Sequence, residues 1–115
     1  LLPIAESHNI PVIEDACQSI LGSIEGKNAG TWGNAGAFSL HPLKNLNIWS
    51  DGGLIVTDET DLADELYLLR NHGLVDRDTV SILGYNSRLD TFQAVVGNWL
   101  IPKTHKIANK RIVNK

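Results

Sequence analysis

The sequence predicts an α/β protein, and three observations support this class. Apolar runs with the length of β-strands lie at residues 10–13, 35–40 and 54–57, and helical patterns precede the first run and follow the last. Stretches rich in glycine, asparagine and aspartate separate these elements. The composition, with 43% hydrophobic and 20% charged residues over 115 positions, excludes a disordered, collagen-like or disulfide-stapled chain.

The first predicted strand places a candidate site residue. Residues 1–8 have the pattern of the last turns of a helix, and a turn at Asn9 leads into the run 10–13. A continuous apolar run is typical of a buried parallel strand, and Glu14 and Asp15 close this one. Because ligands of open α/β sheets bind at the carboxyl ends of the strands, Asp15 lies where a functional group is expected.

Turns and two further strands come next. Residues 22–36 carry five glycines and are predicted to form turns and close backbone contacts. The run 35–40 is predicted to be a strand that Pro42 ends, since proline favours an extended residue before it. The third strand, 54–57, follows the Asp-Gly-Gly sequence at 51–53.

Helices are predicted for the rest of the chain. Asp58 is expected to be the N-cap of a helix with leucines on one face. Ser87 and Asp90 match a Ser-x-x-Asp capping box for a second helix. Pro102 is expected either to end that helix or to begin the next, which carries the basic tail.

The tail differs in charge from the rest of the chain. All 13 acidic residues lie at or before Asp90, whereas half of the 10 basic residues follow it. These are Lys103, Lys106, Lys110, Arg111 and Lys115. Helical spacing places several on one solvated face, and aromatic side chains for base stacking are absent there. We therefore expect a solvent-exposed helix face and no nucleic-acid partner.

Composition also indicates the compartment and excludes some kinds of site. A single Cys17 cannot form an internal disulfide. No apolar run approaches the roughly 18 residues of a membrane span, and the start lacks a signal-peptide pattern. We expect a cytoplasmic protein without a membrane partner. The four histidines lack metal-ligand spacing, so no metal site is expected.

Lys44 is the candidate with the most specific surroundings. It follows the second strand and Ser39, and glycine-rich segments lie on both sides. A desolvated lysine can form a Schiff base with a carbonyl. Pyridoxal phosphate requires such a lysine, an acid at its ring nitrogen, and hydroxyls and amides at its phosphate. Taken alone, a lysine in a loop such as Lys44 is typical of a solvated surface residue, and Asp15 could be a cap or a locally satisfied carboxylate.

Six motifs occur in order along the chain, at 14–18 (EDACQ), in the spaced glycines to Gly36, at 38–45 (FSLHPLKN), 51–53 (DGG), 70–73 (RNHG) and 84–90 (GYNSRLD). Together they resemble the DegT/DnrJ/StrS family of pyridoxal-phosphate-dependent sugar aminotransferases. The resemblance implies a fold-type I large domain, three-layered with a mainly parallel sheet and present here in part. Residues 1–115 would be its central, cofactor-binding portion, with an N-terminal part and a small C-terminal domain outside this sequence.

The resemblance implies roles at matching positions. It makes Lys44 the Schiff-base lysine and Asp15 the partner of the pyridinium nitrogen. Gln18 would lie beside the cofactor ring, and Ser39 would bind the phosphate. Asn86 matches an asparagine that reaches the phosphate of the neighbouring subunit's cofactor, which implies a homodimer with a shared active site.

Two further positions have weaker assignments. Arg88 falls where some members place a substrate-contacting arginine. His41 could also contact substrate, or it could simply form a local hydrogen bond before Pro42. Cys17 stands where the family more often has alanine, which suggests a small packing residue and not a nucleophile.

The implied reaction moves an amino group from an amino acid, glutamate being expected, to a keto group on a nucleotide-linked sugar, as in polysaccharide or antibiotic sugar biosynthesis. Alternatives are a pyridoxamine-phosphate-dependent sugar dehydratase, a catalytically silent regulatory or binding protein of the same fold, and a lysine-dependent aldolase. Relatives that act as dehydratases carry histidine at the lysine position, so Lys44 favours amination. Alone, the 115 residues are expected neither to bind the cofactor tightly nor to turn over.

Overall fold

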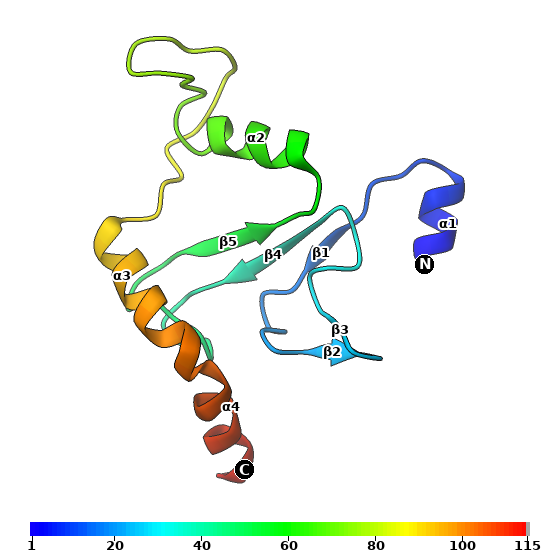
Figure 1. Cartoon of the computed structure of the whole chain (residues 1–115), viewed down its shortest axis with the longest axis vertical. Helices are drawn as coiled ribbons and strands as arrows, with labels where there is room; N and C mark the ends of the chain where they lie inside the picture. The colour runs from blue at the N-terminus through cyan, green and yellow to red at the C-terminus, as the bar shows by residue number, and fades with distance from the viewer. Residues whose placement is uncertain (115) are drawn as a thin grey trace.

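A three-stranded sheet lies at the centre of the computed structural model, which describes residues 1–114. The strand order is β1 (Ile13–Asp15), β4 (Ala35–Ser39), β5 (Gly53–Val56). β1 and β4 are parallel, whereas β5 runs antiparallel to β4 (Figure 1). A small hairpin, β2 (Ser23–Ile24) and β3 (Lys27–Asn28), lies within the glycine-rich segment.

Helices precede and follow the sheet, which confirms the predicted α/β class. They are α1 (Leu2–Ser7), α2 (Thr60–Leu69), α3 (Thr91–Leu100) and α4 (Thr104–Val113), with a 3₁₀ turn, η1 (Ile101–Lys103), between the last two. The helix expected at the start and the helix expected for the basic tail are both present. Pro102 lies in the 3₁₀ turn, so it belongs to neither α3 nor α4. Lys115 lies outside the described residues.

β1 begins later than predicted and contains the two acidic residues. Pro11 has no N–H to donate to a ladder, and the Val12 N–H donates to the side chain of Asn34 at 2.7 Å. The register pairs Asp15 with Ala37, so the carboxyl ends of β1 and β4 lie side by side. The third strand, in contrast, starts and ends one residue earlier than predicted, at Gly53 and Val56.

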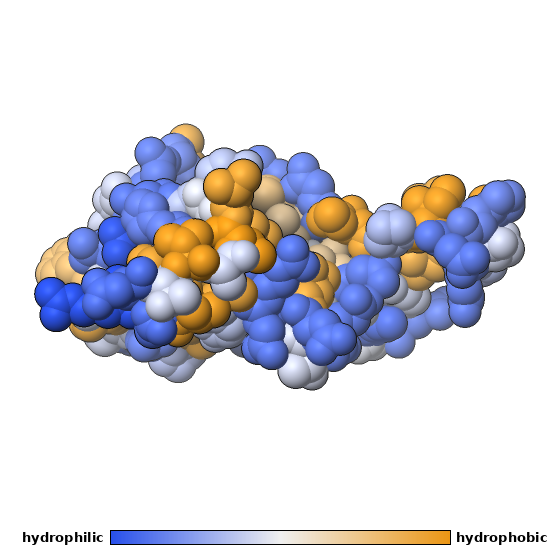
Figure 2. Space-filling model, turned by 90° about the horizontal axis from the view of Figure 1, so that it is seen from above, coloured by the Kyte–Doolittle hydropathy of each residue, from blue (hydrophilic) through white to orange (hydrophobic). Residues whose placement is uncertain are grey.

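The prediction of a buried first strand is wrong for this chain. Ile13 is 73% exposed, and Ile55 on β5 is 54% exposed. The molecule measures 51 × 42 × 18 Å, and a helix alone is about 10–12 Å wide, so its thickness does not accommodate helices on both faces of the sheet. Apolar side chains therefore gather on the surface, as Figure 2 shows.

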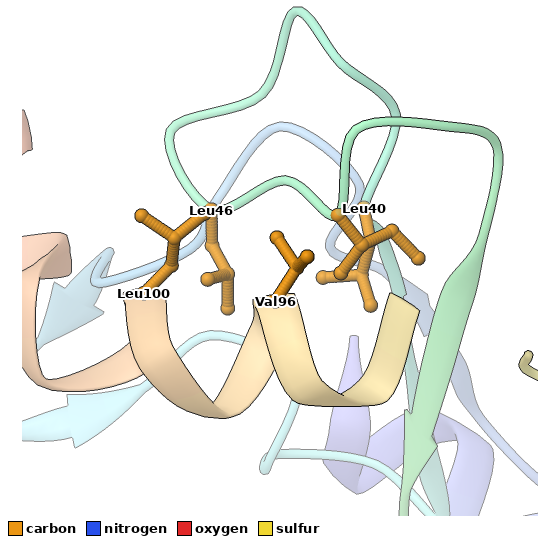
Figure 3. Packing of buried hydrophobic residues seen from close by; sticks show 5 residues of the cluster. Leu40, Leu46, Val96 and Leu100 are labelled. Atoms are coloured by element: carbon orange, nitrogen blue, oxygen red, sulfur yellow. The ribbon is translucent and has the colours of Figure 1, made fainter. Parts of the chain in front are cut away.

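The hydrophobic core lies between α3 and the loop that follows β4. Its buried residues are Leu40, Leu46, Ile48, Val96 and Leu100. Val96 and Leu100 point from α3 toward Leu40 and Leu46 (Figure 3). Burying a side chain of this size contributes about 1.5–3 kcal/mol. The core thus anchors the 40–48 loop on both sides of Lys44.

The N-terminus of α3 differs from the sequence prediction. Asp90 is the N-cap, its carboxylate accepts the Phe92 N–H at 2.8 Å, and Gln93 completes the capping box. The predicted Ser87–Asp90 box is wrong, because the helix starts three residues later than that pattern requires. The Gln93 side chain also donates to the Asp51 carbonyl at 2.9 Å, which ties α3 to the loop before β5.

The predicted N-cap of α2 is also wrong. Glu59, not Asp58, occupies the position, and it makes no side-chain capping bond. Thr57 explains the shift, because its hydroxyl accepts the Glu59 N–H at 3.1 Å and donates to the Asn34 carbonyl at 2.6 Å. Within the described residues, no helix is long and apolar enough to cross a membrane.

Replacing the α3 cap tests this assignment. We expect Asp90→Ala in the full-length protein to lower the free energy of unfolding by about 1 kcal/mol, because a Phe92 N–H loses its acceptor. Ser87→Ala is the matched control and should change it by less than about 0.5 kcal/mol. Denaturant unfolding measures both, and the reverse ranking would support the box predicted from sequence.

Candidate active site

Three predicted site residues lie at or just after the carboxyl edge of β1 and β4. Asp15 ends β1 and Ser39 ends β4. The strands remain joined just beyond Asp15, where the Ala16 N–H donates to the Ala37 carbonyl at 2.9 Å. Lys44 lies in the loop directly after Ser39, close enough for its charge to act on Asp15. A carboxylate, a hydroxyl and an amine therefore occupy one end of the sheet.

A tight turn sets the position of Lys44. The Lys44 N–H donates to the His41 carbonyl at 2.9 Å, so residues 41–44 form a β-turn with Pro42 at its second position, where proline is favoured. The Lys44 carbonyl accepts the Asn47 side-chain amide at 3.3 Å. The core residues on either side of the turn hold it against α3, and Lys44 itself is half-buried.

The electrostatics of this edge favour an ionised Asp15. Its carboxylate accepts the Cys17 N–H at 3.1 Å, and this bond is the main cause that lowers the pKa of Asp15. The Cys17 thiol lowers the pKa further, desolvation raises it in part, and the positive charge of Lys44 makes the smallest contribution, which again lowers it. The side-chain hydrogen bond between the Cys17 thiol and Asp15, together with desolvation and the charge of Asp15, raises the pKa of the thiol.

The remaining predicted residues lie around this edge or beyond it. Gln18 is exposed in the turn just after β1, where the Ser19 N–H bonds the Ala16 carbonyl. Asn86 and Arg88 lie on the β5 side of the sheet, beside α2, and line an open depression of about 1320 Å³. Arg88 Nε donates to the side-chain oxygen Oδ1 of Asn86 at 3.1 Å, and among the described residues the side-chain NH₂ of Asn86 has no acceptor.

His41 has contacts within its own turn. Its backbone N–H donates to the Ser39 hydroxyl at 3.3 Å, and its Nδ1 accepts the Leu43 N–H at 3.2 Å. Its Nε2 lies 3.8 Å from a carboxylate oxygen of Asp51. The structure therefore provides the local hydrogen bond that was one of the two interpretations of this residue.

Glu14 has a structural role that the sequence did not indicate. Its side chain accepts the backbone N–H groups of Gly30 at 2.9 Å, Trp32 at 2.5 Å and Gly33 at 2.9 Å. Desolvation alone would raise its pKa, but these bonds together lower it. Glu14 thus fixes the glycine loop against β1. The only signal in the sequence is a carboxylate at a strand end followed by clustered glycines.

The glycine loop must approach β4 closely for Glu14 to reach it. Gly30 has a φ of +82°, and a Cβ atom there would lie 2.5 Å from the Phe38 ring. A Cβ on Gly36 would lie 2.1 Å from the Gly30 carbonyl oxygen. Larger residues at either position would separate the loop from the strand.

The parallel pair β1 and β4, with Asp15 at one carboxyl end and the Lys44 turn after the other, lies within an aminotransferase-type domain. The family model described as the DegT/DnrJ/EryC1/StrS aminotransferase family matches residues 1–114. The chain belongs to this family, and it corresponds to part of a fold-type I aminotransferase domain with an incomplete mixed sheet.

Relatives of known name are longer than this chain. It is 44% identical over 96 residues to the UDP-N-acetyl-3-dehydro-alpha-D-glucosamine 3-aminotransferase of Acidithiobacillus ferrooxidans, which covers 84% of this chain and 26% of that protein. It is 39% identical over 108 residues to a protein of Geobacillus stearothermophilus named a pleiotropic regulatory protein. This match covers 94% of this chain and 29% of that protein. The chain thus spans less than a third of the length of these relatives.

Solved structures agree with the fold. A DegT DnrJ EryC1 StrS aminotransferase from Brucella abortus superposes with a TM-score of 0.86 at 36% identity, covering 91% of this chain and 28% of the other. Streptomyces venezuelae DesV in complex with a ketimine intermediate superposes with a TM-score of 0.85 at 35% identity, covering 91% of this chain and 28% of the other. E. coli GDP-4-keto-6-deoxy-D-mannose-3-dehydratase with bound hydrated PLP superposes with a TM-score of 0.80 at 26% identity, covering 89% of this chain and 31% of the other.

The family uses pyridoxal phosphate, and the groups at the β1 and β4 edge fit it. Asp15 is held ionised by the Cys17 N–H, as an acid facing a protonated ring nitrogen must be. The Ser39 hydroxyl accepts from His41 and keeps its own hydrogen to donate to a phosphate oxygen. Lys44 supplies the amine.

Glu14 provides a test of how this edge is stabilised. A lowered pKa means that its contribution is present above the pH at which the unfolded carboxyl titrates and is lost as the pH falls through the folded-state value. We expect Glu14→Gln to reduce the free energy of unfolding of the full-length protein by about 1–2 kcal/mol at neutral pH. This deficit should shrink on acidification, as denaturant unfolding between neutral and acidic pH will measure.

Glu65→Gln, on the exposed face of α2, is the control and should show neither effect. A Glu14→Gln deficit of constant size at every pH would contradict the ionic character of the contact.

Proposed function

We propose that the full-length protein transfers an amino group from an amino acid, glutamate being the expected donor, to a keto group on a nucleotide-linked sugar. The observation that carries the proposal is that Asp15, Ser39 and the Lys44 turn lie at the same end of the sheet. The names of relatives support the substrate class, since the Acidithiobacillus protein is named for amination of a UDP-linked dehydro-sugar. The relevant products are amino sugars of bacterial polysaccharides or antibiotics.

The residues have separate tasks in this proposal. When bound, pyridoxal phosphate supplies an aldehyde to which an amine can attach and a ring that accepts electrons from the substrate carbon. Asp15 holds a negative charge at the ring nitrogen, and Gln18 lies beside the ring. Ser39 donates to the phosphate and fixes its position. Lys44 holds the cofactor, and its amine then moves the proton at the substrate carbon.

A second copy of the protein completes the site in this proposal. The side-chain oxygen of Asn86 accepts a hydrogen bond from Arg88. Its side-chain NH₂ group has no acceptor among the described residues, so it could donate to the phosphate of a neighbouring subunit's cofactor. Arg88, exposed in the same segment, is placed to contact an anionic part of the substrate. The expected assembly is a homodimer in which each active site uses residues of both copies.

The dehydratase is the second candidate, because a dehydratase structure has the same fold as this chain. A primary amine at position 44 favours amination, since it can both hold the cofactor and carry a proton. Assays of the full-length protein with a panel of nucleotide keto-sugars and glutamate separate the two reactions. Amino-sugar formation supports the proposal, and loss of a sugar hydroxyl without amination contradicts it.

Replacing Lys44 tests the role of its amine. We expect Lys44→Ala in the full-length protein to abolish both the visible absorbance of the attached cofactor and turnover, because no other described amine follows β4 at this edge. Lys106→Ala, exposed on α4, is the control and should retain both. Absorbance spectra and amino-sugar formation are the measurements, and persistence of both in Lys44→Ala would contradict the assignment.

Replacing Asp15 tests the role of its charge. Asp15→Asn keeps an oxygen for the Cys17 N–H but removes the negative charge. We expect the cofactor still to attach to Lys44, while turnover falls about a hundredfold or more, since a fixed charge at the reacting group is lost. Asp78→Asn, in the exposed loop after α2, is the control. Unchanged turnover in Asp15→Asn would place the ring nitrogen elsewhere.

A further inference from the structure

The His41 side chain caps the turn that carries Lys44. Its Nδ1 accepts the Leu43 N–H at 3.2 Å, two residues along the chain. This is the bond that Asx side chains make when they close a turn onto their own backbone. The turn is closed a second time by the Lys44 N–H, which donates to the His41 carbonyl at 2.9 Å. One residue therefore supplies acceptors to two successive N–H groups.

The contacts also define which form of the ring is present. Because a backbone N–H can only donate, Nδ1 carries no hydrogen when this bond is made, and a neutral ring has its proton on Nε2. Nε2 lies 3.8 Å from Asp51 Oδ1, so the protonated nitrogen faces a carboxylate. Asp51 is itself held through its carbonyl by Gln93 of α3. The ring thus lies between the lysine turn and the loop that leads to β5.

We infer that His41 is a positioning residue for Lys44, and that its imidazole acts by holding the 41–44 turn closed and not by contacting substrate. The inference rests on the proposed role of Lys44. With the turn closed, the lysine stem starts from a fixed backbone position in the loop that follows Ser39. With the turn frayed, the amine samples more conformations and meets the cofactor aldehyde in the reactive orientation less often.

The bond geometry provides matched variants. Asparagine places its side-chain oxygen where it can accept the N–H two residues ahead, so His41→Asn keeps the capping bond. Glutamine is one methylene longer, so His41→Gln keeps a polar group directed toward Asp51 without the short capping geometry. Alanine removes both. His105→Ala, exposed on α4, controls for loss of a histidine elsewhere.

The test measures attachment of the cofactor to Lys44 in the full-length protein. Protein freed of cofactor is mixed with pyridoxal phosphate, reduced with borohydride at set times, and Lys44 modification is measured by peptide mass spectrometry. We expect attachment to be about threefold to tenfold slower or weaker in His41→Ala and His41→Gln, as for loss of one hydrogen bond. In His41→Asn we expect the rate and extent of attachment to be close to those of the unmodified protein. His105→Ala should not differ.

A second measurement does not depend on the cofactor. Amide hydrogen exchange of the cofactor-free protein should be faster over residues 43–44 in His41→Ala and restored in His41→Asn. Equal attachment and exchange in all variants would overturn the inference, as would an Asn variant as impaired as the Ala variant. Unchanged attachment with a raised KM for the sugar would identify His41 as a substrate contact instead. If the unmodified protein attaches no cofactor at Lys44, the proposed function fails, and the inference fails with it.

Discussion

The packing of the 40–48 loop against α3 is the contact on which the geometry of the candidate site depends. Leu40, Leu46 and Ile48 lie in the loop, and Val96 and Leu100 come from a helix much further along the chain. A connecting loop without such a contact would remain mobile, because ordering each backbone residue costs about 1–2 kcal/mol. The buried Leu40 and Leu46 on the two sides of Lys44 offset this cost, so the loop that carries the lysine is packed at both ends.

Strand pairing, and not this loop packing, brings Asp15 and Ser39 to the same edge. Parallel pairing of β1 and β4 puts Asp15 and Ser39 at the same end of the sheet. Successive strand residues point to opposite faces, so Glu14 is directed away from Asp15 and binds the glycine loop. The two neighbouring carboxylates therefore have different roles. Glu14 holds the glycine loop against β1, and Asp15 is a negatively charged group at the edge of the sheet.

Fold similarity alone does not decide which reaction this family member performs. Aminotransferases and a dehydratase superpose on the chain with comparable TM-scores, and one relative is named a regulatory protein. The side chains at the edge bear on this choice, since a fold can carry several activities. Under the proposed function, the amine at position 44 is the group that favours amino transfer.

The sequence by itself determined the α/β class, the approximate strands and helices, and the presence of Asp15, Ser39 and Lys44 after strand-like runs, because apolar periodicity and turn residues are local signals. It placed the caps of α2 and α3 wrongly, since Thr57, Asp90 and Gln93 compete with equally suitable neighbours and tertiary contacts select among them. Only the tertiary structure decided that β5 is antiparallel, that Ile13 is exposed, and that Glu14 binds Gly30 and Gly33. These features depend on which distant backbone groups meet, and no local pattern in the chain specifies that.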